Sequence, residues 1–246
     1  MQTLGSTSVP PLLKYLRHAE HLGVATAPAL AAAGITAGQL DDNSLRLPVE
    51  AHERLLEYFC EHSGDLLFGL NSARFVLPNS WSVLGYITMN CATLGEVMNL
   101  IILFELLVGD MGTSRAEMVG EQVRLIWNCR HQQPRIRRHM VENVLASWLV
   151  YARWIAYTEL SPSHLFFEHP LPDGAQFTTH TFTSDAGSSG YKLYTPGTGK
   201  AAARPLIVVS EEEEISGIAL ESAAMQASRV GSVSCSSLKR WHRMMA

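Results

Sequence analysis

The chain has 246 residues, of which 47% are hydrophobic, so it can bury a sizeable core and is not disordered as a whole. Its 19 Lys and Arg residues against 23 Asp and Glu residues give a formal charge of −4. A protein that binds nucleic acid over its whole surface would carry a strong basic excess, so that class is excluded, although a small basic patch is not.

The N-terminal half reads as a series of helices separated by helix-breaking residues. Prolines suit the first turn of a helix and glycine its C-terminal end, and Asp65 is placed to cap the short helix that follows it. On this basis we expect helices over residues 10–22, 27–33, 48–62, 65–70 and 81–91.

The next helix begins with the capping-box sequence Thr93-Leu94-Gly95-Glu96 and extends to about Val108. Its residues are apolar nearly all round, which predicts burial on most sides.

After Gly109 the pattern changes from helix to strand. Residues 113–119 and 122–129 are separated by Gly120-Glu121, and the second run alternates apolar and polar residues, which predicts a hairpin with one covered face. A long helix from Pro134 to about Leu160 and a short strand at 165–167 follow. The fold class is therefore α+β, a mostly helical domain with a small antiparallel sheet, followed by an irregular tail.

The composition shifts again after Pro172. Residues 173–210 are rich in Gly, Ser and Thr, and we expect them to be a mobile linker after a domain over 1–172. Residues 211–246 have helical propensity and end basic, so we expect a helical basic tail.

Cysteine usage and hydropathy bear on the compartment. The four cysteines, at 60, 91, 129 and 235, are far apart and form no C-x-x-C pair, which favours free thiols and a cytoplasmic protein. No secretory signal begins the chain, and the apolar stretch 97–109 is too short and too polar to span a bilayer, so we expect no membrane association.

Motifs for catalysis and for cofactors are missing from the sequence. We expect no cofactor and no metal, since His18 and His21 lack a carboxylate or cysteine to complete a shell. Cys91 with His164 or His169 would be the nucleophile and base of an enzyme, but a buried inert thiol suits the apolar flanks of Cys91 better.

Several short segments occur in an order that resembles a known family. They are Ala33-Gly34-Ile35, Leu40-Asp41, Leu45-Arg46-Leu47-Pro48, Ser63-Gly64-Asp65, Gly69-Leu70, Leu84-Gly85-Tyr86, Thr93-Leu94-Gly95-Glu96 and Phe166-Phe167-Glu168-His169-Pro170. Over about residues 10–172 the chain resembles the N-terminal arabinose-binding-like domain of AraC/XylS-type transcription regulators.

The resemblance implies a cytoplasmic regulator whose N-terminal domain binds a small effector and is able to form a homodimer. In such regulators a separate C-terminal domain of two helix-turn-helix units reads DNA. Only residues 173–246 follow Pro172 here, so we expect that domain to be truncated, rearranged or frameshifted.

One fragment of the tail is similar to a single helix-turn-helix. Residues 227–231 would form the turn, and Ser236, Ser237, Lys239 and Arg240 would face DNA. The alternative is a basic amphipathic tail that contacts no DNA.

The resulting hypothesis is a ligand-sensing regulatory domain without catalysis, with the effector between the hairpin and the helices. Its candidate ligand contacts are Trp81, Tyr86, Asn90, Trp127 and Trp148. The alternatives are a small cytoplasmic enzyme with a Cys/His pair in an aromatic pocket, and a truncated regulator that acts only by pairing with intact partners.

Overall fold

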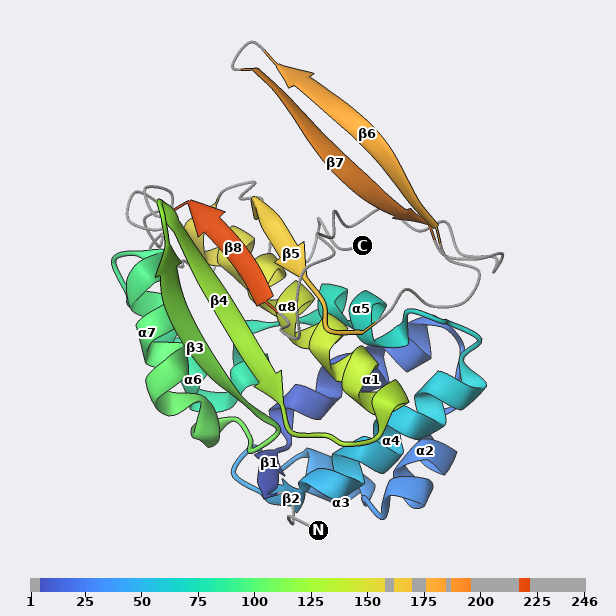
Figure 1. Cartoon of the computed structure of the whole chain (residues 1–246). Coiled ribbons are helices and arrows are strands. Elements are labelled where there is room, and N and C mark those ends of the chain that lie inside the picture. The colour runs from blue at the N-terminus through green and yellow to red at the C-terminus, as the bar shows by residue number, and fades with distance from the viewer. Residues whose placement is uncertain (1–4, 158–161, 170–175, 185–186, 196–216, 222–246) are drawn as a thin grey trace.

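The computed structural model describes residues 5–157, 162–169, 176–184, 187–195 and 217–221. Helices pack against one face of a four-stranded antiparallel sheet, and the long helix α8 runs behind that sheet (Figure 1). The α+β class predicted from the sequence is confirmed.

The α-helices are α1 Pro10–His21, α2 Thr26–Ala33, α3 Ala37–Leu40, α4 Val49–His62, α5 Phe68–Ser72, α6 Ser82–Thr88, α7 Leu94–Phe104 and α8 Pro134–Ala156. Short 3-10 helices are η1 Ala73–Phe75, η2 Pro78–Trp81 and η3 Glu105–Leu107. The strands are β1 Ser6–Ser8, β2 Arg46–Pro48, β3 Gly112–Val119, β4 Gln122–Cys129, β5 His164–Phe166, β6 Gln176–Ser184, β7 Gly187–Thr195 and β8 Gly217–Glu221.

The helix ends follow the signals read from the sequence. Gly34 ends α2 in the left-handed conformation, with a φ of 71°, which glycine adopts without strain. The Oδ1 atom of Asp65 accepts a hydrogen bond of 2.9 Å from the backbone N–H of Leu67, just before α5. The predicted helix over 81–91 is shorter, because η2 and α6 meet at Ser82, whose φ is 53°.

Helix α7 begins at the predicted cap, where the Thr93 hydroxyl accepts a hydrogen bond from the Glu96 N–H. The prediction that this segment is buried on most sides is wrong. Leu103 is 70% exposed and Leu106, in η3, is 59% exposed. One face of α7 packs inward, and no described element covers the other face.

The predicted hairpin is present as β3 and β4, which pair from Gly112 with Cys129 to Val119 with Gln122. The rest of the sheet comes from later in the chain. Its strand order is β3-β4-β8-β5, so β8 lies between the hairpin and β5 and pairs antiparallel with both neighbours.

Parts of the two segments expected after Pro172 form strands. Inside the expected linker 173–210, β6 and β7 pair over nine residues each as a separate antiparallel hairpin, because extended Thr- and Ser-rich segments suit a strand ladder. The expected helical tail over 211–246 is wrong for Gly217–Glu221, which pairs with β4 and β5 as strand β8. The candidate DNA contacts Ser236, Ser237, Lys239 and Arg240 lie outside the described residues.

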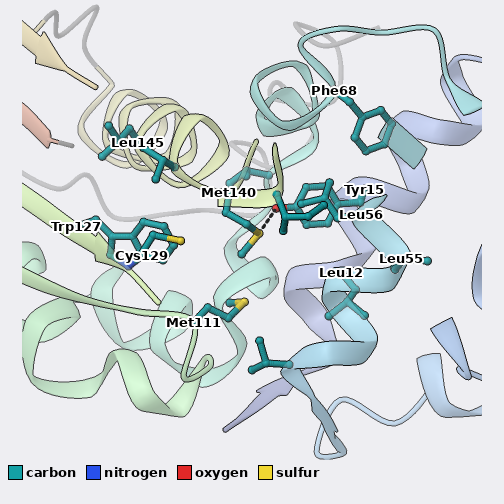
Figure 2. Close-up of a cluster of buried hydrophobic side chains, with 14 of the residues drawn as sticks. Leu12, Tyr15, Leu55, Leu56, Phe68, Met111, Trp127, Cys129, Met140 and Leu145 are labelled. Carbon is teal, nitrogen blue, oxygen red and sulfur yellow. Dashed lines mark hydrogen bonds between the residues drawn. The ribbon is translucent and has the colours of Figure 1, made fainter. Parts of the chain in front are cut away.

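The hydrophobic core lies where α1, α4, α5 and α8 meet the inner face of the sheet (Figure 2). Tyr15 is buried between helices, and its hydroxyl donates to the sulfur of Met140 at 3.6 Å. Cys60, Cys91 and Cys129 are buried free thiols, as predicted. Within the described part of the chain, no helix is long and apolar enough to cross a membrane.

Candidate functional site

A cavity lies between the sheet and the helices. Its volume is about 110 Å³, measured for the centre of a water-sized sphere. On this measure one water molecule needs roughly 10–15 Å³, so the space suits a molecule of on the order of ten non-hydrogen atoms. Part of the wall is formed by two buried side chains of β8, Ile218 and Leu220.

The wall is mostly apolar and aromatic. It is built from α1, η2, α6, α7, η3, α8, β3, β4 and β8, together with the segment between η3 and β3. Its aromatic members are Trp81, Trp127, Trp148 and Tyr151. A concave apolar site with a few polar groups is typical of small-molecule binding.

Three of the five predicted ligand contacts line this cavity, namely Trp81, Trp127 and Trp148. Tyr86 and Asn90 do not. Leu84, Gly85 and Thr88 form the inward face of α6, which places Tyr86 on the outside at 56% exposure. Asn90 is also exposed, and its side-chain N–H donates to the Tyr86 carbonyl at 2.9 Å.

A close contact between α6 and α8 fixes the aromatic part of the wall. The Tyr151 hydroxyl donates to the Gly85 carbonyl at 2.7 Å and shares a hydrogen bond of 2.9 Å with the Thr88 hydroxyl. The Trp81 ring lies 4.4 Å from the Tyr151 ring, centroid to centroid. Gly85 is required here, because a Cβ atom would lie 1.8 Å from the carbonyl oxygen of Pro78.

One charged side chain in the wall has no polar partner in the part of the chain that the structure describes. Lys14, on α1, is only 5% exposed and lines the cavity. Among the described residues it makes no hydrogen bond and no ion pair, and its ammonium lies 5.4 Å from the centroid of the Tyr15 ring. Burial lowers the pKa of Lys14 to about 7, since desolvation disfavours the charged form.

The other charged group in the wall is already paired with hydrogen-bond donors. Glu105 accepts from the Ser114 backbone N–H at 2.8 Å and from the Ser114 hydroxyl at 2.5 Å. Desolvation raises the pKa of Glu105, while these hydrogen bonds and Arg130 oppose the rise. Glu105 therefore braces η3 against β3 as well as lining the cavity.

Sequence reasoning missed Lys14, because its burial is known only from the structure. Lys14 follows Pro11 by three residues and precedes His18 by four, and all three lie on one face of α1. His18 is also buried, and its Nε2 lies 2.9 Å from Asp65. The face of α1 that carries Lys14 is therefore buried, and the Lys14 side chain points into the protein with it.

The enzyme alternative gains no geometric support. Cys91 forms no hydrogen bond to a basic side chain among the described residues, and burial raises the pKa of its thiol. No group of three metal-ligating side chains occurs within the part of the chain that the structure describes.

The arginines at the start of α8 are tied to neighbouring elements. Arg137 forms a two-point ion pair with Glu168, with distances of 2.6 and 2.9 Å, and also donates to the Cys129 carbonyl. Arg135 and Arg138 donate to backbone carbonyls of residues 60 and 66. These bonds offset the unfavourable position of positive charge at a helix N-terminus.

Comparison with known proteins decides the family. Residues 23–186, well over half of the chain, match the family model of the arabinose-binding domain of AraC transcription regulators, N-terminal. The chain belongs to the AraC family. A search of curated proteins returned no significant match. The AraC-type match begins after α1, so it does not include Lys14, and it ends before β8.

A solved structure resembles this AraC-type chain in fold. The crystal structure of the transcriptional regulator CdpR from Pseudomonas aeruginosa aligns with a TM-score of 0.50 at 14% identity. The alignment covers 88% of this chain and 59% of CdpR. At this identity the likeness concerns the fold alone.

Proposed function

We propose that this AraC-type chain is a regulatory module that binds a small effector in the cavity between sheet and helices and thereby controls transcription. The observation that carries the proposal is the apolar cavity, walled on one side by the sheet and on the other by α1, α6, α7 and α8. Such a cavity does not stabilise the fold, because empty apolar space weakens a core.

The sensor assignment is tested by ligand-dependent thermal stability. A panel of metabolites is screened for an increase in melting temperature of the full chain, since a ligand that binds the native state stabilises it by mass action. Ala152 lines the cavity, and Ala152→Phe fills it. An effector should stabilise the wild type and not Ala152→Phe; equal shifts in both would place binding elsewhere and contradict the proposal.

The proposal includes no catalysis. It also includes a cytoplasmic location, and the three buried free thiols support that location. DNA contact by Ser236, Ser237, Lys239 and Arg240 is a further part of it. Electrophoretic mobility shift over a range of salt concentrations tests that part, because phosphate contacts weaken steeply as salt rises. No shift at low salt would leave a sensor that acts through partner proteins.

We also propose a homodimer, as AraC-type membership suggests. Exposed apolar residues of α6, α7 and η3 offer a surface for it, including Tyr86, Leu103, Phe104 and Leu106. Contiguous exposed apolar surface is typical of protein interfaces.

A further inference from the structure

We propose that the effector is an amphipathic monoanion, a molecule with one carboxylate on an apolar chain or ring, and that its carboxylate pairs with the Lys14 ammonium inside the cavity. This inference rests on the proposed function, because it names the ligand class of the same site.

The first step is the isolation of the Lys14 charge. Lys14 is only 5% exposed, so its ammonium keeps little of its hydration, and a protein ordinarily replaces that hydration with a carboxylate or with carbonyl oxygens. Among the described residues Lys14 has neither, and desolvation is the cause of its lowered pKa. The side chain lines the cavity, so a ligand can supply the missing partner.

The second step is the state of the other polar groups in the wall. Glu105 is occupied by Ser114, and Tyr151 is occupied by Gly85 and Thr88. Among the described wall residues, the polar groups without a hydrogen bond are the Lys14 ammonium and the indole N–H groups of Trp81, Trp127 and Trp148. All of them are donors and one is a cation, which favours an anion over a cation. Pairing a carboxylate with a desolvated ammonium is worth more here than at a surface, because the surroundings are apolar.

The third step concerns the body of the ligand. The remaining wall consists of aliphatic residues from α7, α8 and β8 and of indole rings, so it offers few hydrogen bonds to a polar molecule such as a sugar. A hydrocarbon chain or an aromatic ring buries apolar area against this wall. The anionic group and the apolar body together define the ligand class.

The test compares three probes of equal chain length by isothermal titration calorimetry at pH 6.5 with the full chain: octanoate, 1-octanol and octylamine. We expect the wild type to bind octanoate at least tenfold more tightly than 1-octanol, and octylamine least tightly. In Lys14→Met, octanoate affinity should fall at least tenfold, while 1-octanol affinity should change less than threefold. Arg17→Met removes a cation from the same helix outside the cavity and should keep the octanoate preference.

The outcomes separate the two proposals. Equal affinity of the wild type for octanoate and 1-octanol, or an octanoate preference that persists in Lys14→Met, would overturn the anion assignment and leave the cavity as an effector site. Failure of all three probes to bind the wild type would contradict the anion assignment, and the metabolite screen with Ala152→Phe would then decide the sensor function separately. A circular dichroism spectrum and a melting curve for each variant exclude loss of folding as the cause.

Discussion

Replacing Lys14 by methionine should stabilise the ligand-free protein, in a way that depends on pH. Burial lowers the pKa of Lys14 from its usual 10.5 to about 7. Each pKa unit corresponds to about 1.4 kcal/mol, so the buried charged form costs up to about 5 kcal/mol relative to the unfolded chain. Methionine keeps an unbranched apolar stem as far as the Cε position and removes the charged nitrogen.

The sign follows from proton linkage. Between pH 7 and 10.5 the unfolded chain holds the Lys14 proton and the folded chain releases it, so wild-type stability rises with pH across this window. The advantage of Lys14→Met should therefore shrink, from about 5 kcal/mol at pH 6 to about 2 kcal/mol at pH 9. The contributions of titrating groups that do not interact with Lys14 cancel, since both proteins carry them. His52 is the group coupled to Lys14, because its pKa is lowered by burial, by His131 and, in smaller part, by the Lys14 charge.

The assay is urea unfolding followed by circular dichroism at pH 6, 7, 8 and 9, in bis-tris and Tris chloride to avoid carboxylate buffers that would occupy the site. Arg17→Met is the control, and its stability difference from the wild type should not change with pH in this window. A Lys14→Met difference that is constant with pH, or a variant less stable than the wild type at pH 6, would refute the account of Lys14 as an uncompensated buried charge.

Three further predictions concern stability and assembly. Gly69→Ala should destabilise the protein by more than about 3 kcal/mol in urea unfolding, because the new Cβ would lie 2.2 Å from the His139 carbonyl oxygen. The control Gly38→Ala has no atom within 4 Å of the new Cβ and should be neutral or slightly stabilising. Equal effects of the two substitutions would contradict this prediction. Arg137→Met should lower the free energy of unfolding by about 2 kcal/mol, because it removes a partly buried two-point ion pair with Glu168, and Glu168→Gln should lower it less. An unchanged free energy of unfolding in Arg137→Met would show that the ion pair is solvated. Leu103→Asp together with Leu106→Asp should convert the proposed dimer to a monomer in analytical ultracentrifugation. The control Met118→Asp, at a similarly exposed position on β3, should leave the dimer intact. A dimer that persists in the double variant would exclude the α7–η3 surface as the interface.

Local signals predicted the parts of the fold that local chemistry determines. Gly34, Asp65 and Thr93 end or begin helices as expected, because caps and left-handed turns depend on a few neighbouring residues. The apolar composition of α7 did not predict its burial, since burial depends on how many elements pack against a helix, which composition does not encode.

Long-range pairing was beyond the reach of sequence patterns. Strand β8 lies in a segment whose composition favours helix, and its strand structure depends on hydrogen bonds to β4 and β5. The candidate site shows the same limit. The tryptophans were chosen because aromatic residues favour pockets, and all three line the cavity. Lys14 stands out because no described residue pairs with its charge, and that depends on the three-dimensional placement of residues far apart in the sequence.

The position of β8 bears on how the chain is made. Strands β4 and β5 are synthesised well before residues 217–221, yet in the sheet that the structure describes it is β8 that joins them. Until that strand leaves the ribosome, β4 and β5 each present an open edge of unpaired N–H and C=O groups, and such edges promote aggregation. Any shortened chain that stops before Gly217 would keep those edges permanently, so expression of soluble protein should require the residues through Glu221.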